Sequence, residues 1–190
     1  NRLTKITDAL GGTTVYEYDA LGQVVSITNA LGGKTSTIYD ANGQTVTAAN
    51  ELAGEGNTHK VRYVYDKMGR VIRRYNEDNT YVKYAYDKNG NVLSMTNERG
   101  KTYSYTYDKN NLLLTETDPL GGVTAYTYTP TGMVESVTDA MEGVITYTYD
   151  KNDNLIRIVD AEGHSLSYGY DKNNCPVSAT DANGNRTGYT

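Results

Sequence analysis

The side chains that could do chemistry are few and widely separated in this sequence. His59, His164 and Cys175 lie in different segments, whereas nucleophilic catalysis needs a nucleophile and a base within hydrogen-bond reach of each other. Cys175 has no His near it in the sequence, and related segments carry Gln, Arg or Asn at the matching position. We therefore interpret the three residues as surface or half-buried side chains. The sequence predicts no enzyme and no catalytic residue.

One short segment has part of a calcium-binding pattern. Residues 87–91, Asp-Lys-Asn-Gly-Asn, resemble half of a loop with alternating oxygen ligands, but the distal Glu of such a loop is missing. Carboxylates recur along the chain in turns, which favours capping of the backbone over acid–base pairs. No phosphate-binding loop and no Cys/His metal spacing occurs. We therefore expect no cofactor and no metal, and a weak calcium site at 87–91 is the alternative.

These residues belong to a unit that returns along the whole chain. A Tyr-Asp pair recurs every 21 residues, with one longer step of 26, and Tyr128-Thr129 takes the place of one pair. A fixed period of this size indicates a repeat protein. The repeat residues that we expect to matter for structure are Tyr18, Asp19, Gly22, Tyr39, Asp40, Gly43, Tyr65, Asp66, Gly69, Tyr86, Asp87, Gly90, Tyr107, Asp108, Tyr128, Gly132, Tyr149, Asp150, Tyr170 and Asp171.

Each repeat contains two turns of the form Asp/Asn-x-x-Gly. The first turn follows the Tyr, and the second turn follows the next apolar run. The leading Asp or Asn can accept a hydrogen bond from the backbone N–H two residues on, and Gly in the fourth place supplies a left-handed conformation. Where the first turn lacks Gly, it has Asn111, Asp153 or Asn174, the residue types that best tolerate positive φ. In one second turn Glu142 stands in the Gly place, with Gly143 after it.

The segments between turns are six or seven residues long and alternate with period two, so each repeat is predicted to be a β-hairpin. The fold class is all-β: an antiparallel hairpin meander of about sixteen short strands. Residues 1–190 form a single repeat array, with a loop insertion at 50–60. A single layer of many twisted strands curls, so we expect a strip of a spiral β-shell.

The turn type predicts which residues face each other. We expect Tyr18 opposite Val24, Tyr16 opposite Ser26 and Tyr149 opposite Leu155, which places the repeated Tyr-x-Tyr residues on one face, the tyrosine face. The other face would carry residues such as Ile27 and more of the charged residues. We therefore expect the tyrosine face to lie inward.

Composition excludes several classes of protein. The net charge is -5 and the basic residues are scattered, which gives no electrostatic footprint for nucleic acid. No apolar run is long enough to span a membrane, and no signal peptide is visible. A single Cys excludes an internal disulfide framework. Both ends of the sequence cut through repeats, so we expect a fragment of a longer repeat protein.

The repeat formula also resembles a known family. Tyr-Asp-x-x-Gly-x-Val/Leu with its period of 21, followed by Thr-Asp/Asn-x-x-Gly, is similar to the YD repeat of the Rhs family. Bacterial polymorphic toxins, cocoon components of insecticidal toxin complexes and animal teneurins share this repeat. The resemblance covers essentially the whole chain in eight copies. Its departures, at Asn111, Thr129, Asp153, Asn174 and the five-residue insertion, preserve the turn geometry.

The resemblance implies a hairpin strip that spirals into a hollow shell. In bacterial members the shell encloses a C-terminal toxin, so the expected partners are the rest of the protein's own shell and an enclosed toxin domain. The full-length protein would then be secreted or at the cell surface. The alternative is an adhesion or carbohydrate-binding array whose partner is a cell-surface glycan or protein. A β-propeller is less favoured, because the copies do not alternate with a period of 42.

Overall fold

The computed structural model describes residues 2–51 and 58–189. In these ranges the chain forms eighteen antiparallel strands in one unclosed sheet and no helix. The all-β prediction is confirmed. The strand number exceeds the predicted sixteen, because the eight repeats account for β2 to β17 and incomplete repeats add β1 and β18. The strands are β1 (Lys5–Thr7), β2 (Thr13–Tyr18), β3 (Val24–Thr28), β4 (Lys34–Tyr39), β5 (Thr45–Glu51), β6 (Thr58–Tyr65), β7 (Val71–Tyr75), β8 (Tyr81–Tyr86), β9 (Val92–Thr96), β10 (Thr102–Tyr107), β11 (Leu113–Thr117), β12 (Val123–Tyr128), β13 (Val134–Thr138), β14 (Val144–Tyr149), β15 (Leu155–Val159), β16 (Ser165–Tyr170), β17 (Pro176–Thr180) and β18 (Arg186–Gly188).

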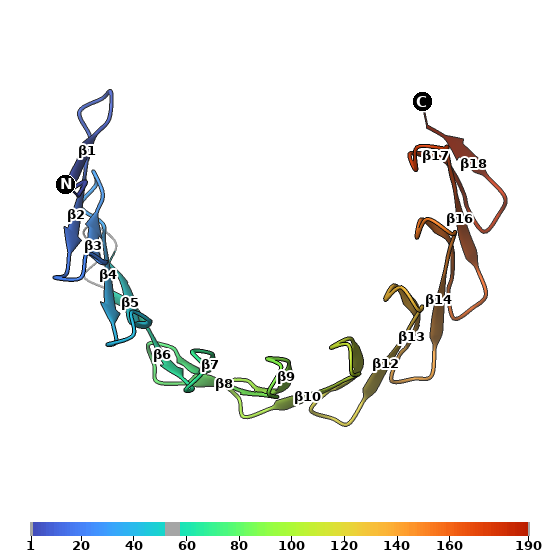
Figure 1. The fold of residues 1–190 in the computed structure, drawn as a ribbon, viewed down its shortest axis with the longest axis horizontal. Coiled ribbons are helices and arrows are strands. Elements are labelled where there is room, and N and C mark those ends of the chain that lie inside the picture. Colours follow the sequence, from blue (N-terminus) through green and yellow to red (C-terminus); the bar gives the residue numbers. More distant parts are fainter. Residues whose placement is uncertain (1, 52–57, 190) are drawn as a thin grey trace. The chain divides into compact units, whose positions relative to one another are not determined.

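The chain divides into two compact units. One consists of Asn1–Ala85 with Met95–Gly100, and the other of Tyr86–Ser94 with Lys101–Thr190. In the first unit β1 to β8 pair in sequence order, and in the second unit β10 to β18 do the same (Figure 1). Within the second unit the strip bends progressively from one hairpin to the next (Figure 1). Each unit is therefore a hairpin meander in which every strand pairs with the strands that precede and follow it in the sequence.

The single layer has almost no hydrophobic core. Among the described residues Val82 is the one buried hydrophobic side chain, at 6% exposure, and no side chain is fully buried. In β10 and β14 exposure nevertheless alternates along the strand: the tyrosines are half-buried and the Thr and Ser residues between them are exposed. The tyrosine face is therefore the better covered face of these strands.

A β-bulge after the first turn shifts the register of seven hairpins, namely β2–β3, β4–β5, β6–β7, β10–β11, β12–β13, β14–β15 and β16–β17. Tyr18 pairs with Val24, as predicted, but Glu17 pairs with Ser26, so Val25 is an extra residue on the second strand. Tyr149 pairs with Leu155, as predicted, and the same shift follows between Thr148 and Tyr149. A bulge of this kind places two residues of one strand against one residue of its partner.

The bulge moves several residues to the other face. The prediction of Tyr16 opposite Ser26 was wrong, because Tyr16 pairs with Ile27. Ile27 therefore belongs to the tyrosine face, and so does Ile158, which pairs with Tyr147. Arg73 pairs with Val64 and Arg157 with Thr148, so both cations lie on the face opposite to the tyrosine face. Which face lies inward stays a prediction.

The insertion at 50–60 is partly strand. β5 continues through Asn50 and Glu51, β6 starts at Thr58, and Asn50 pairs with His59. The prediction of a loop was wrong for these residues, because the added length prolongs the hairpin ladder. Residues 52–57 lie outside the described part of the chain.

The turns have the predicted left-handed corners. Gly22, Gly90 and Asn111 have φ of 91°, 97° and 66°. Glu142 itself takes a φ of 66°, so the Gly place of that turn is kept by a non-Gly residue. Its neighbour Gly143 has another reason to be small: a Cβ there would lie 2.8 Å from an Asp139 carboxylate oxygen.

Gly90 offers a clean test of the corner. An added Cβ would meet nothing within 4 Å, so Gly90→Ala changes only the backbone preference. We expect it to lower the free energy of unfolding by about 1–2 kcal/mol, and Gly90→Asn by less, both measured by urea denaturation. Lys88→Ala, in the same turn, is the control. Equal losses for Gly90→Ala and Lys88→Ala would contradict the role of the left-handed corner.

Candidate functional site

In most turns the leading Asp or Asn closes the turn with its side-chain oxygen. In the turn after β8, Asp87 Oδ1 accepts hydrogen bonds from the backbone N–H of Asn89 and of Asn91, both at 2.9 Å. The Asp87 N–H donates to the Asn91 carbonyl at 3.0 Å. The bond to the N–H two residues on was predicted, and the bond to the N–H four residues on is additional. Thr129, which replaces Asp in one repeat, accepts the second of these bonds with its hydroxyl, from the Met133 N–H at 3.1 Å.

These donors stabilise the ionised carboxylates. The side-chain amide of Asn154, together with the backbone N–H groups of the turn, lowers the pKa of Asp150 below its ordinary value. Asn185 does the same for Asp181. A carboxylate that accepts several hydrogen bonds favours its charged form. The turn carboxylates therefore act as capping anions, in agreement with the turn interpretation of 87–91.

The second Tyr of the repeat makes a hydrogen bond to the preceding repeat, here called the tyrosine–carbonyl bond. The hydroxyl donates to a backbone carbonyl 15 residues earlier, for example from Tyr149 to Val134 at 2.8 Å. Tyr65 reaches back 20 residues, to Thr45 at 2.7 Å, because the five-residue insertion lies between them. The other bonds of this kind are Tyr18 to Leu3 at 2.5 Å, Tyr39 to Val24 at 2.9 Å, Tyr107 to Val92 at 3.1 Å, Tyr128 to Leu113 at 2.7 Å and Tyr170 to Leu155 at 3.0 Å.

The end of the ladder between hairpins explains why a side chain is needed there. The paired register between β3 and β4 runs from Thr28↔Lys34 to Ser26↔Ser36. The Val24 carbonyl lies beyond the last of these pairs, and the Tyr39 hydroxyl is its donor. A backbone carbonyl that is shielded from water by a ring and has no hydrogen-bond donor lowers the stability of the fold. A side chain that both covers the strand and donates a hydrogen bond to this carbonyl is therefore favoured. Tyr meets both requirements, and Phe does not.

Burial of the phenols changes their acidity. Desolvation raises the pKa of Tyr65, Tyr107, Tyr128 and Tyr149 above the ordinary value, and neighbouring ionisable groups add to the effect. The neutral phenol is the form that can donate to a carbonyl. The tyrosine–carbonyl bond is therefore maintained throughout the neutral pH range.

A second set of links joins consecutive first turns. The side-chain amide of Gln44 donates to the Gly69 carbonyl at 2.9 Å. Asn91 donates to the Asn111 side-chain oxygen at 2.7 Å, and Asn154 to that of Asn174 at 2.8 Å. Sequence reasoning missed these links. The sequence signal for these links is a Gln or Asn directly after the left-handed residue of the first turn, as at Gln44, Asn91 and Asn154. Cys175 occupies this position in the last complete repeat.

The fold does not bring together His59, His164 and Cys175, the residues whose side chains could take part in catalysis. His59 lies 3.3 Å from Glu77, and Cys175 is exposed as a free thiol. His164 Nδ1 lies 3.1 Å from Asp160 Oδ2, and Glu162 is close enough to form a group with them whose ligand atoms lie within 4.8 Å of one another. All three belong to one largely exposed turn, and Asp160 Oδ1 already accepts two backbone N–H bonds. The group is thus an ordinary capped turn with a His beside it.

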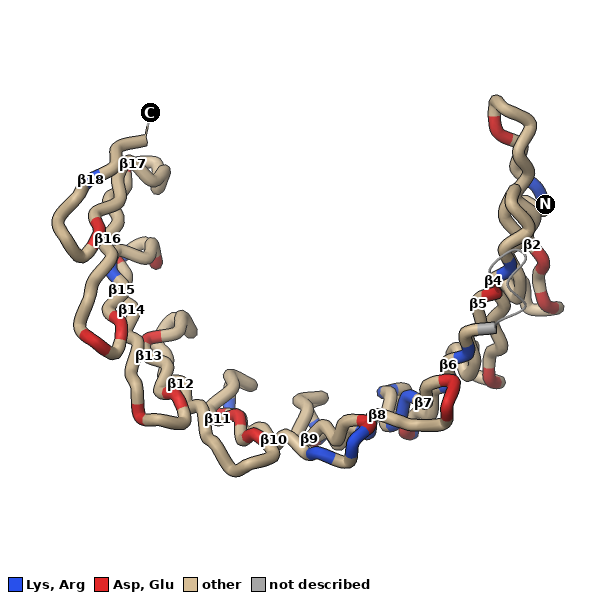
Figure 2. Tube along the Cα trace, turned by 180° about the vertical axis from the view of Figure 1, so that it is seen from behind, with Lys and Arg blue, Asp and Glu red and all other residues tan. Residues whose placement is uncertain are grey.

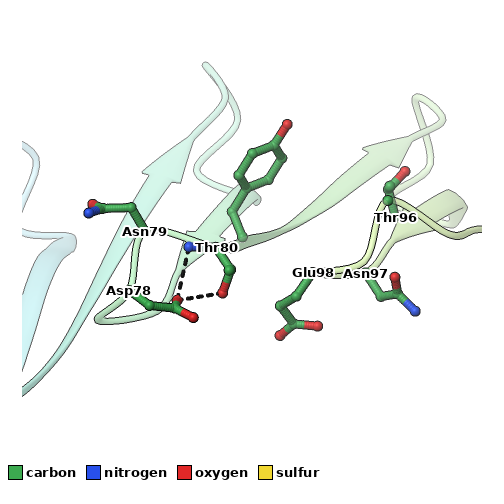
Figure 3. A pocket seen from close by; sticks show the side chains of 8 residues that line it. Asp78, Asn79, Thr80, Thr96, Asn97 and Glu98 are labelled. Carbon is green, nitrogen blue, oxygen red and sulfur yellow. Dashed lines mark hydrogen bonds between the residues drawn. The ribbon is translucent and has the colours of Figure 1, made fainter.

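The hollows of the surface are gaps between consecutive turns. Figure 3 shows one of about 310 Å³, in which Asp78 accepts bonds from the Thr80 backbone N–H at 2.9 Å and hydroxyl at 2.6 Å, with Glu98 on the far side. Similar gaps lie between the turns near Pro130 and near Leu21. The repeat geometry alone produces them, so none is distinguished as an active site.

The comparisons with known proteins agree with this geometry. The family model described as RHS Repeat matches residues 1–34, 19–51, 86–123, 107–141, 128–163 and 149–186. This chain belongs to the RHS-repeat family. The comparison with curated proteins gave no match. The RHS repeat is thus the unit in which the turns and the tyrosine–carbonyl bonds recur.

Solved structures share the fold at low sequence identity. The crystal structure of TcdB2-TccC3-Cdc42 has a TM-score of 0.67 at 16% identity, over 95% of this chain and 12% of that chain. The Tc holotoxin pore of Photorhabdus luminescens has a TM-score of 0.66 at 16% identity, with the same coverage of 95% and 12%. The crystal structure of TcdB2-TccC3 has a TM-score of 0.57 at 17% identity, over 94% and 12%. The RHS chain described here thus spans about an eighth of these chains.

Removing one hydroxyl tests the tyrosine–carbonyl bond. We expect Tyr149→Phe to lower the free energy of unfolding by about 1 kcal/mol or somewhat more, because it leaves the Val134 carbonyl without its donor. Tyr147→Phe, in the same strand, is the matched control, since the Tyr147 hydroxyl makes no hydrogen bond to the described residues. Equal losses for the two variants in urea denaturation would contradict the role of the bond.

The raised phenol pKa values predict a pH dependence. A group whose pKa is higher in the folded state contributes stability below its unfolded pKa of about 10 and loses it as the pH rises through the folded pKa. The stability difference between the wild type and Tyr149→Phe should therefore be constant from neutral pH to about pH 9 and shrink above about pH 10. Urea denaturation at several pH values measures it. A difference that grows with pH would contradict the assignment.

Proposed function

We propose that this RHS chain forms part of the wall of a shell that encloses a toxin or effector domain of the same polypeptide. The observation that carries the proposal is the single-layer strip in which hairpin after hairpin is bonded to the preceding one through its tyrosine, as at Tyr128, Tyr149 and Tyr170. A wall of this kind extends by repetition and needs no second layer. Its action would be mechanical: it separates the enclosed domain from its targets until release.

The likeness in fold to TcdB2-TccC3 and to the Tc holotoxin pore supports a toxin context. Because this chain spans only 12% of those chains, the closed particle, the enclosed domain and its release belong to the full-length protein. Secretion or display at the cell surface follows from the same proposal. Among the described residues no helix is long and apolar enough to cross a membrane.

The structure also bears on catalysis and adhesion. His59, His164 and Cys175 lie in separate turns or strands, so neither imidazole is placed to act as a base for the Cys175 thiol. A role without catalysis is therefore our proposal. A carbohydrate-binding array would need free aromatic faces and hydroxyls, whereas the second Tyr of most repeats is half-buried and already donates to a carbonyl. This arrangement favours the wall over the adhesion array.

The test uses the full-length polypeptide that contains this chain. Cryo-electron microscopy is expected to show a closed particle with density inside the wall, and limited proteolysis should leave the enclosed domain intact until the particle is unfolded. The isolated enclosed domain, treated with the same protease, is the control. A solid particle, or equal cleavage of the enclosed and isolated domains, would end the proposal. Glycan binding that is lost after Tyr→Ala changes on the tyrosine face would support adhesion instead.

A further inference from the structure

The basic residues of this acidic chain are concentrated in one segment. Residues 58–85 contain seven Lys and Arg against three Asp and Glu, a net charge of +4, whereas the whole chain has a net charge of -5. Figure 2 shows these cations along β6 to β8. The sequence-based description of scattered basic residues was therefore wrong for this segment, where the structure gathers them on adjacent strands.

The strand register sorts these cations by face. Tyr75 pairs with Arg62 on one side and with Tyr81 on the other, while Arg73 pairs with Lys83. These residues share the face opposite to the tyrosine face, since Arg74 is the one that pairs with Tyr63. Lys60, two residues before Arg62, lies on the same face. We call this set the basic–aromatic surface: Lys60, Arg62, Arg73, Tyr75, Tyr81 and Lys83.

Two of the cations are held in place by aromatic rings. The Arg62 guanidinium carbon lies 4.7 Å from the centre of the Tyr75 ring, and that of Arg73 lies 5.4 Å from the Tyr81 ring. The two rings are themselves in contact, with centres 5.3 Å apart. Arg62 also donates to the Asn79 side-chain oxygen at 2.6 Å. A guanidinium fixed over a ring has lost much of its freedom in advance, which favours binding of a carboxylate in a forked geometry.

Within the part of the chain that the structure describes, the cations of this surface have no acidic partner in an ion pair. Within the described residues Arg62, Arg73, Lys60 and Lys83 form no ion pair, whereas Arg70 lies 2.8 Å from Asp66 and Arg74 lies 3.4 Å from Glu98. Lys60, Tyr81 and Lys83 are exposed. The two rings are outside the Tyr-x-Tyr pattern, so the lateral bonding of the repeats does not account for them.

We propose that the basic–aromatic surface binds an acidic polypeptide segment of a partner protein. Outer strands of a three-stranded sheet lie about 10 Å apart, and alternate residues of an extended peptide project to one side about 7 Å apart. A short extended segment with a carboxylate at every second residue can therefore place several carboxylates near the four cations of the basic–aromatic surface. A long polyanion such as nucleic acid would instead extend onto the acidic remainder of the chain and be repelled there.

The experiment measures binding of a fluorescein-labelled decapeptide of alternating Glu and Ser by fluorescence anisotropy at low ionic strength. We expect the Arg62→Gln, Arg73→Gln double variant to weaken binding roughly tenfold, and high salt to weaken binding by the wild type. A peptide with Gln in place of Glu should not bind. Lys151→Gln with Lys172→Gln removes the same charge from exposed turns outside the surface and should leave the affinity unchanged.

A further variant protects the test against misfolding. Lys60→Gln with Lys83→Gln removes two exposed cations and leaves both Arg–Tyr stacks in place, so its circular dichroism should match the wild type while its affinity falls. Unchanged affinity in this folded variant, or an equal loss in the Lys151 and Lys172 control, would overturn the proposal. Tighter binding of a single-stranded oligonucleotide or of heparin to the same residues would overturn the choice of a polypeptide partner.

Discussion

The structure depends on one hydrogen bond, from a tyrosine hydroxyl to a backbone carbonyl of the preceding repeat. A single-layer sheet cannot bury its polar groups in a core or leave covered ones unpaired. The ladder between hairpins ends before the Val24 and Val134 carbonyls, and the hydroxyls of Tyr39 and Tyr149 supply the missing donors. The ring of the same residue covers the neighbouring strand. This double role accounts for Tyr at the second position of the Tyr-x-Tyr pattern, where Phe would cover the strand but leave the carbonyl without a donor.

The same bond gives the strip its nearest-neighbour character. Each repeat is closed by its Asp-capped turns and is joined to the previous repeat by the tyrosine and, in several repeats, by an amide between turns. Stability in such an array is close to a sum of repeat and interface contributions. No residue has the importance that a buried Leu has in a globular domain, since no described side chain is fully buried. The strip can therefore be long without becoming harder to assemble.

The sequence predicted everything that depends on local turn chemistry. The period, the hairpins, the left-handed corners at Gly22 and Asn111, and the pairing of Tyr18 with Val24 all follow from residues a few positions apart. The prediction failed one residue beyond that pair, because nothing in the residue types marks Val25 as a bulge. A one-residue shift moves every later side chain of the strand to the other face. The basic–aromatic surface was missed for the same reason: Arg62, Arg73 and Tyr81 are brought together only by the true register.

The insertion at 50–60, between β5 and β6, shows that the two edges of the strip differ in their tolerance of added residues. The added residues lengthen β5 and β6 at the second-turn edge, yet Tyr65 still bonds to the Thr45 carbonyl and Asp66 still caps its turn. The first-turn edge holds the bulge and the tyrosine–carbonyl bonds, so a change of length there would break both. New segments can therefore be inserted at the second-turn edge of the strip during evolution, while the spacing of the first-turn edge is kept.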